Sequence, residues 1–359
     1  MDKYLFYTFS LQLLSNAVQT TLLNSTNNPG NDLSPEMQTF YDKGLLRAAG
    51  PELVHTQFAQ KRSIPKNGGK SIQFRRFSSL PKATSALTEG VTPDGQTLNV
   101  TEVTVTVAQY GDYITLSDML ELTAVDNTIV ETTKLLGQQG GRTMDTVTRN
   151  AICGGTNAVF SSTWSGTTET KVSARSSLNG TAVLKVEDIK RAVTKLKAAN
   201  APKINGDYVG IIHPYMTHDL TADPEWKDWT KYTDAEHMYE GEIGKIWGVR
   251  FVETSEAKII NDNTCPTKTA ANTEAGTAAV YYSVFCTLIF GENAYGAVDI
   301  AGQNMETIVK PKGSAGSADP LNQRSSVGWK AAGAGVLLLP EYLVRVESCS
   351  AYNPTAAAN

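Results

Sequence analysis

Histidine and carboxylate side chains gather in one stretch of the sequence, where a metal site could be built. His213, His218 and His237 lie close to Asp219 and Asp223. Two histidines that bind one metal from a single helix are normally four residues apart, as in HExxH, so that both lie on the same face. The spacing of five between His213 and His218 does not achieve this, and a proline follows His213 at the end of an expected strand. We therefore predict structural histidines, with no metal site and no cofactor.

The same stretch holds carboxylates beside tryptophans, a combination that glycosidases use. Asp223 and Glu225 form the nearest pair, directly before Trp226. Packed domains also bury aromatic side chains, and these acids fall on polar faces of expected helices. We predict no catalytic residue, and a carbohydrate-active enzyme that uses Asp223 and Glu225 is kept as an alternative.

Other signatures of chemistry are absent from the sequence. It contains no GxSxG, P-loop or GxGxxG motif, and its four cysteines are far apart with no CxxC spacing. Such cysteines are typical of reduced, buried or half-buried thiols rather than a disulfide framework or a zinc site. The longest charge-free apolar stretch near the C-terminus, residues 331–339, is too short to span a membrane. The net charge of −4 argues against sequence-specific DNA binding, which needs a basic face.

The strongest pattern in the sequence is a separation of charge. Residues 61–82 carry seven Lys or Arg and no acid, whereas residues 83–133 carry eight Asp or Glu and no Lys or Arg. Such segregation indicates that the two blocks pair across the hairpin within one chain, or that the basic block attracts the acidic block of a neighbouring copy.

Alternating residues within these charge blocks predict two β-strands, at 70–78 and 98–108. Together they form a long hairpin with a wide tip at about 79–97. An isolated two-stranded hairpin is marginal in water, so this one must pack against something else. The apolar phase slips at Gly111, where we expect a bulge or bend.

Helical patterns follow the hairpin. Asn127 is positioned to cap a long helix that ends near residue 152, and its three internal glycines indicate a bend or a close backbone approach. Further expected elements are a helix at 189–199, strands at 208–212, 279–290, 336–339 and 342–346, and a loop rich in small residues at 310–326. The mixture of separate helices and strands predicts an α+β fold.

The first 32 residues differ from the rest of the chain. No charged residue occurs between Lys3 and Asp32, and apolar residues recur at helical spacing with polar residues between them. This is not the clean apolar run of a secretory signal. We expect an arm that docks on its own or a neighbouring subunit through Phe6, Phe9, Leu13 and Leu14.

Several short motifs occur in order along the chain. They lie at residues 51–58, 66–70, 74–77, 87–95, 206–214, 223–226, 241–253 and 318–324. Together they resemble the major capsid proteins of tailed bacteriophages, in the branch named after the capsid protein of the N4 coliphage. The resemblance covers residues 33–349 and leaves the first 32 residues outside it.

This resemblance implies the tailed-phage capsid fold, also called the Johnson fold, which has an N-terminal arm, an extended β-hairpin loop, a peripheral domain with a long spine helix, and an axial domain. On that basis we expect an arm and helix at 1–60, the extended loop at 61–116, the peripheral domain with the spine helix at 117–185, the axial domain at 186–304, and peripheral C-terminal strands at 305–359.

The resemblance also implies a function without catalysis. The chain would self-assemble into pentamers and hexamers of an icosahedral shell in the virion, enclosing double-stranded DNA without sequence-specific binding. Assembly would occur in the host bacterial cytoplasm, with no membrane, and with portal, scaffolding and decoration proteins as further partners. The shell of a cellular nanocompartment is the alternative within the same fold.

Charged residues around the hairpin and the small-residue loop are the expected subunit contacts. Arg75 and Arg76 are the expected donors to a neighbouring copy, and Glu121 and Asp126 their expected acceptors. The full set of expected interface residues is Arg75, Arg76, Glu89, Asp94, Glu121, Asp126, Lys310, Lys312, Asp319 and Arg324.

Overall fold

The structure is a computed structural model and falls into two compact units, each described separately. It describes residues 54–77, 80–86, 89–90, 92, 95–123, 128–165, 168–226, 245–268, 280–300, 305–314 and 319–359. Residues 108–145 and 300–333 supply the described part of the first unit. The second unit contains residues 54–107, 146–299 and 334–359.

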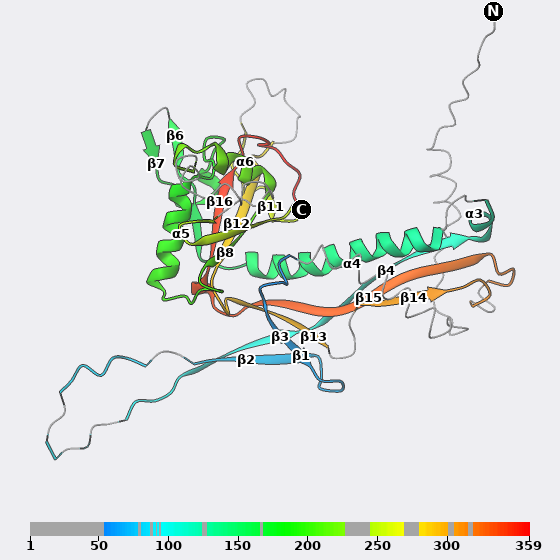
Figure 1. Ribbon diagram of the computed structural model, residues 1–359, viewed down its shortest axis with the longest axis horizontal. Coiled ribbons are helices and arrows are strands. Elements are labelled where there is room, and N and C mark those ends of the chain that lie inside the picture. Colours follow the sequence, from blue (N-terminus) through cyan, green and yellow to red (C-terminus); the bar gives the residue numbers. More distant parts are fainter. Residues whose placement is uncertain are drawn as a thin grey trace, which may run out of the picture. The chain divides into compact units, whose positions relative to one another are not determined.

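The first unit is a long helix against an antiparallel sheet (Figure 1). Its elements are β4 (Ala108–Ser117), α3 (Asp118–Thr123), α4 (Thr128–Cys153), β14 (Glu306–Lys310) and β15 (Arg324–Leu337), of which α4 and β15 also extend into the second unit. β15 pairs with β4 from Arg324 to Gly333 and with β14 on its other side. Leu136 of α4 packs with Val327 and Trp329 of β15, and these side chains are the core of the unit.

The expected long helix is confirmed, and one of its glycines has a packing role. A Cβ atom on Gly140 would lie 2.9 Å from the Met305 side chain and 3.1 Å from the Trp329 ring. A side chain there would force Met305 and Trp329 to shift, so the helix backbone approaches the sheet closely. The Trp329 indole N–H donates to Gln139 Oε1 at 3.1 Å beside this contact.

The bulge or bend expected at Gly111 is absent, and that prediction was wrong. β4 pairs with β15 without interruption through Gly111, which lies opposite Lys330. The phase of the apolar pattern changes instead at Val107, between β3 (Val100–Thr106) and β4. Gly111 serves a close approach, because a Cβ atom there would lie 2.6 Å from the Trp329 carbonyl oxygen.

The second unit is built on a seven-stranded sheet in the order β5-β16-β12-β8-β10-β9, with β11 also paired to β12. These strands are β5 (Ala158–Phe160), β8 (Tyr208–Ile212), β9 (Lys245–Ile246), β10 (Val249–Glu253), β11 (Ile259–Ile260), β12 (Val284–Phe290) and β16 (Leu343–Cys349). Every residue of β8 and β12 is buried, as expected for central strands covered on both faces.

Two helices pack on this sheet, α5 (Val186–Ala198) and α6 (Pro214–Ala222). The apolar face of α5 includes Ile189, Val193 and Leu196, and it shares one buried cluster with Phe285 and Ile289 of β12. The expected helix at 189–199 and strand at 208–212 are thereby confirmed. No helix among the described residues is long and apolar enough to cross a membrane.

Smaller elements complete the second unit. They are β1 (Gln60–Ile64), β2 (Ser71–Phe77), β3, β6 (Thr163–Ser165), β7 (Thr168–Thr170), β13 (Tyr295–Ile300), and short 3-10 turns η2 (Arg175–Ser177) and η5 (Pro340–Tyr342). β1 pairs with β13, β6 with β7, and β2 with β3. The β2–β3 pair is the predicted hairpin.

The last strand lies elsewhere than the sequence suggested. Residues 305–359 were expected to form one peripheral segment, but β16 pairs with β12 over seven residues and with β5 on its other side. Residues 334–359 therefore belong with residues 146–299. The expected segment rested on the family resemblance, and the strand pairing of this chain divides it.

The close packing at Gly140 gives a first prediction. Gly140→Val should lower the free energy of unfolding by about 1–3 kcal/mol, because the added methyl groups must displace Met305 or Trp329. Urea unfolding of the purified chain measures this. The matched control is Lys134→Val at an exposed site of the same helix, where only the helix propensity changes. A Gly140→Val variant as stable as the wild type would contradict close packing, because helix propensity alone favours Val over Gly.

Candidate functional site

The base of the β2–β3 hairpin packs against its own chain. Ile72 lies opposite Val105 and Phe74 opposite Val103, with Phe74 and Val105 both buried. A Cβ atom on Gly296 of β13 would lie 3.3 Å from the Phe74 ring, so the ring covers that glycine. The Arg62 guanidinium lies 5.0 Å from the centre of the same ring. The base therefore has the cover that a two-stranded hairpin needs.

Beyond this base, the hairpin presents apolar side chains to solvent. Phe77 is 61% exposed and lies opposite Val100, which is also exposed. Leu80 and Leu98 extend the exposed apolar surface toward the tip. We call these four residues, Phe77, Leu80, Leu98 and Val100, the hairpin patch. Contiguous exposed apolar groups are typical of interaction sites.

Both hairpin arginines form ion pairs within the chain. Arg75 Nε lies 3.3 Å from Glu102 Oε1 on the facing strand, and Arg76 lies 3.5 Å from Glu341. The sequence left open whether the charge blocks pair within one chain or between copies, and Arg75–Glu102 is a pair of the first kind. Exposed ion pairs of this type contribute about 0–1 kcal/mol, so they leave both arginines available for other contacts.

The acidic residues expected to accept these arginines are described only in part. Glu89 is exposed near the hairpin tip. Asp94 and Asp126 lie outside the described residues, as does the side chain of Glu121. Pairing between copies through these acids stays a prediction.

The loop expected at 310–326 is shorter in the structure, because β14 ends at Lys310 and β15 begins at Arg324, and one of its predicted residues closes it. Asp319 is buried, and its carboxylate accepts from the Arg324 backbone N–H at 2.9 Å. Its carbonyl accepts from the Asn322 N–H at 3.1 Å, so Asp319 shapes the turn into β15. Leu321 at the same turn is 75% exposed. Of the predicted contact residues here, Asp319 faces its own loop.

Lys310 and Arg324 lie together in a groove of about 510 Å³ on the first unit. The groove follows the sheet of β4, β15 and β14, and Tyr113 and Lys330 also line it. Lys312 is exposed beyond the end of β14. The structure therefore brings Lys310 and Arg324 together and leaves both at a surface.

A second apolar surface, missed in the sequence, lies on the first unit. Met119 and Leu122 of α3 are exposed, as are Val130 and Leu135 near the start of α4. We call these four residues the helix patch. The Asp118 N–H donates to the Gln323 carbonyl at 3.0 Å, which joins α3 to the turn that carries Leu321. The sequence held an indication of this surface, since residues 119 and 122 are three apart on a short helix and therefore lie on one face.

The proposed docking face of the arm, Phe6, Phe9, Leu13 and Leu14, lies outside the described residues. Its role stays a prediction.

The carboxylates of the alternative enzyme hypothesis serve local structure. Asp223 accepts from the Val186 N–H at 3.1 Å, at the start of α5, and from the Glu225 N–H. Glu225 pairs with Lys190 at 2.5 Å. Each acid thus has a partner that fixes it to α5, and no observation favours carbohydrate chemistry.

His213 also has a structural role. Its Nδ1 accepts from the Tyr215 N–H at 3.1 Å, which caps α6, and burial lowers the His213 pKa. His218 lies beside Asp219 at 3.3 Å, and His237 lies outside the described residues. Among the described residues, no group of three His, Cys, Asp or Glu is arranged to hold a metal ion.

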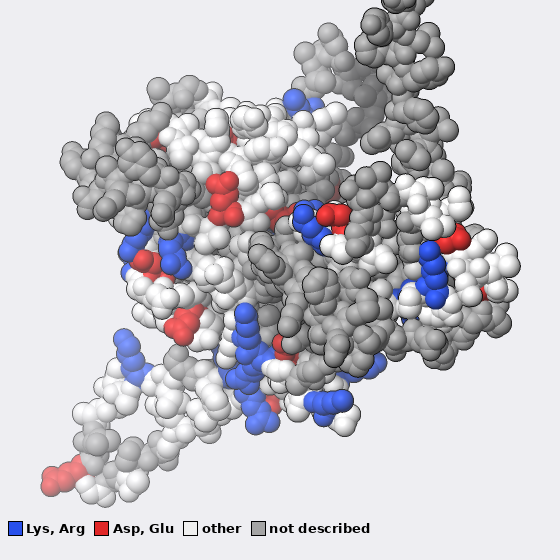
Figure 2. Space-filling view, turned by 45° about the vertical axis from the view of Figure 1, so that its right-hand side comes forward, with Lys and Arg blue, Asp and Glu red and all other residues white. Residues whose placement is uncertain are grey.

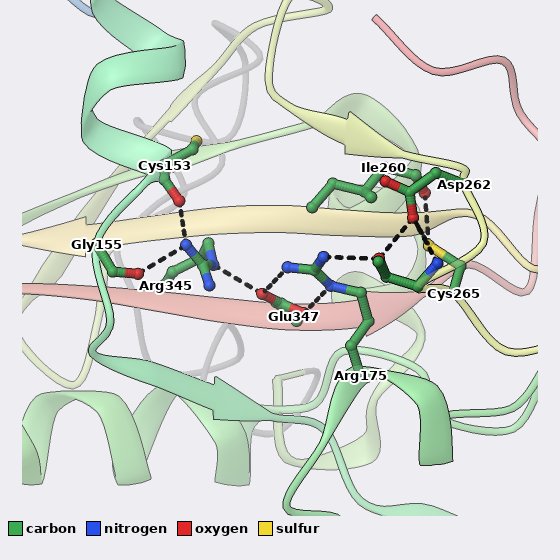
Figure 3. A network of polar contacts seen from close by, with 9 residues as sticks. Cys153, Gly155, Arg175, Ile260, Asp262, Cys265, Arg345 and Glu347 are labelled. Atoms are coloured by element: carbon green, nitrogen blue, oxygen red, sulfur yellow. Dashed lines mark hydrogen bonds and ion pairs between the residues drawn. The ribbon is translucent and has the colours of Figure 1, made fainter.

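The most strongly built polar cluster is centred on Glu347 of β16 (Figure 3). Glu347 is fully buried and accepts from Arg175 at 2.7 and 2.8 Å and from Arg345 Nε at 2.7 Å. Hydrogen bonding to Glu347 raises the pKa of Arg175. Arg345 also donates to the carbonyls of Cys153 and Gly155. The cluster joins β16 to the end of α4 and to η2.

The cysteines are free, as the sequence predicted, and three of the four are buried. Burial raises the pKa of Cys153 to about 11 and that of Cys349 to about 12. Thiols with such pKa values are protonated at neutral pH and therefore weak nucleophiles. They do not suggest covalent catalysis.

The Glu347 cluster gives a second prediction. Glu347→Gln should lower the free energy of unfolding by about 3–5 kcal/mol, because it removes the one carboxylate between two arginines in a buried position. Chemical denaturation measures the loss. Glu306→Gln, at an exposed position of β14, is the control and should change stability by less than about 0.5 kcal/mol. A loss as small as that of the control would show that the ion pairs contribute nothing net.

A family model described as phage capsid protein matches residues 114–303, more than half of the chain. A search by sequence among curated proteins finds no match.

Solved capsid structures share the fold across almost the whole chain. The cyanophage Pam1 capsid is 12% identical with a TM-score of 0.59, covering 98% of this chain and 100% of that one. The capsid of the Helicobacter pylori bacteriophage KHP30 is 12% identical with a TM-score of 0.57, covering 97% and 100%. The cyanophage P-SCSP1u capsid is 14% identical with a TM-score of 0.56, covering 91% of both chains. The expected phage capsid fold is thereby confirmed.

Proposed function

Because the chain belongs to the phage capsid protein family, we propose that it is the major capsid protein of a tailed bacteriophage. Copies associate into pentamers and hexamers, and these rings form an icosahedral shell around double-stranded DNA. Capsid proteins of this fold are structural, and Asp223 and His213 of the enzyme and metal hypotheses have local structural roles.

The observation that carries the proposal is the division of the hairpin into a covered base and an uncovered patch. Phe74 and Val105 are buried on the chain itself, whereas the hairpin patch is exposed. Burying four such side chains contributes about 1.5–3 kcal/mol each before the entropy of ordering is subtracted. A second copy supplies the missing cover.

The helix patch on the first unit is the proposed acceptor for the hairpin patch of a neighbour. The two surfaces differ in sequence and lie on different elements, so the contact is heterologous. Heterologous contacts close into rings when the rotation between copies divides a full turn. This is the geometry that pentamers and hexamers need.

Charged residues beside this apolar contact align the two subunits. Arg75 and Arg76 stand beside Phe77, and the neighbour's helix patch carries Asp118 and Glu131 near its apolar residues. Opposite charges at the rim speed docking and align the partners, and both effects weaken as salt rises.

Finer assignments are part of the same proposal. The ordered motifs favour the branch named after the N4 coliphage, and the arm docks on shell surface. The chain is a virion component assembled in the host cytoplasm, with portal, scaffolding and decoration proteins as partners.

The hairpin patch gives a third prediction. Phe77→Ser, Leu80→Ser and Leu98→Ser together should reduce the yield of shells at least tenfold. The free energy of unfolding of the single subunit should change by less than about 1 kcal/mol, because these side chains are exposed in the subunit. Electron microscopy and sedimentation measure shells. The control is Gln73→Ser with Thr104→Ser, a polar cross-strand pair on the same hairpin. Normal shells from the triple variant would refute the contact.

The hairpin charges give a fourth prediction. Arg75→Glu with Arg76→Glu should slow assembly most at low salt, without unfolding the subunit, because the basic rim would then repel an acidic neighbour. Light scattering across a salt series measures the rate. Adding Glu121→Arg and Asp126→Arg should partly restore it.

A charge swap distinguishes attraction between copies from ion pairing within the hairpin. Arg75→Glu with Glu102→Arg keeps the cross-strand pair in reversed order. If this swap and the double reversal both assemble at the wild-type rate at every salt concentration, the charges act only within the chain.

A further inference from the structure

A separate basic surface lies before the hairpin, on β1 and the loop that leads to β2. It consists of Lys61, Arg62, Lys66 and Lys70, all exposed, and we call it the basic corner. Figure 2 shows Lys and Arg side chains gathered beside the base of the hairpin. The segment contains no acidic residue from 61 to 82. Four positive charges within ten positions form a local field that the net charge of −4 conceals.

The charges of the basic corner are not neutralised by neighbouring carboxylates. Glu102 and Glu341 pair with Arg75 and Arg76 of the hairpin. Among the described residues, Lys61, Lys66 and Lys70 take part in no ion pair. Three ammonium groups are therefore available to an anionic partner.

The loop that carries two of these lysines leaves its backbone open. Asn67 and Gly69 adopt left-handed conformations, with φ of 69° and 89°. A Cβ atom on Gly69 would meet nothing within 4 Å. Lys66 and Lys70 flank this exposed turn, and the open space beside Gly69 leaves room for a phosphate group between them.

The composition of the basic corner favours nucleic acid over protein. Protein interfaces have an apolar core and contain few lysines. Here the apolar residue of β1, Ile64, is buried, and no large apolar side chain is exposed among described residues 60–76. Lysines are compact, hydrated charges on flexible stems, which suit contact with a phosphate backbone whatever its sequence.

We propose that the basic corner binds the phosphate backbone of double-stranded DNA without sequence preference. The proposal rests on the proposed function only in naming duplex DNA as the polyanion. The side chains make no base contacts in this mode, because they position phosphates and carry no sequence information.

The test uses the full-length, unassembled subunit and a fluorescent 20-base-pair duplex of arbitrary sequence. Anisotropy gives the affinity between 50 and 200 mM KCl for the wild type and for Lys61→Gln/Lys66→Gln/Lys70→Gln. The logarithm of the binding constant falls linearly with the logarithm of the salt concentration, and removing three phosphate contacts should make this slope shallower by about 2.7. Wild-type affinity should thus fall about 40-fold more than that of the variant over this range.

The matched control is Lys134→Gln/Lys171→Gln/Lys197→Gln, three exposed lysines elsewhere, which gives the same net charge. It should keep the wild-type slope. Equal slopes for both triple variants, or no binding by the wild type at 50 mM KCl, would overturn the proposal.

Shell formation by the same variants keeps this proposal distinct from the proposed function. Normal shells with weakened DNA binding support the basic corner as a DNA contact and leave the capsid role intact. Lost shells with unchanged DNA binding would show that the corner is instead a contact between subunits, which overturns the proposal. Circular dichroism confirms that each variant is folded.

Discussion

The pairing of β16 with β12 is the interaction on which the second unit depends. It sets the last strand of the chain beside a strand that is buried along its whole length, and β5 and β8 complete the arrangement. Glu347 then lies in the interior, where a lone carboxylate would be unstable. Arg175 and Arg345 provide its counter-charges, so the sheet and the ion cluster require one another.

Much of the fold was predictable because its elements have strong local patterns. Correct elements came from the alternating residues of β2 and β3, from the apolar residues at helical spacing along α4, and from the amphipathic face of α5. For the three glycines of the long helix the sequence left a bend and a close backbone approach open, and Gly140 shows the close approach. Gly111 was misjudged, because a glycine gives the same signal for a bulge and for tight packing. The Glu347 cluster was not predicted, since Arg175 lies 172 positions from Glu347 in the sequence.

The candidate site shows the same limit. The alternating residues located the hairpin correctly, and the Arg75–Glu102 pair follows from the register of two adjacent strands. The split between a covered base and an open patch could not be predicted, since it depends on where Phe74 meets β13. The helix patch was missed because short apolar helices are usually buried, and exposure is a property of the folded subunit.

The open hairpin patch also affects the life of the subunit before it joins others. Until they are covered, these side chains stay exposed on a thin two-stranded extension, and exposed apolar surface invites wrong contacts with partly folded neighbours. That risk grows with waiting time and with crowding by identical copies. Rapid capture by a correct partner therefore shortens the time during which these side chains can make a wrong contact.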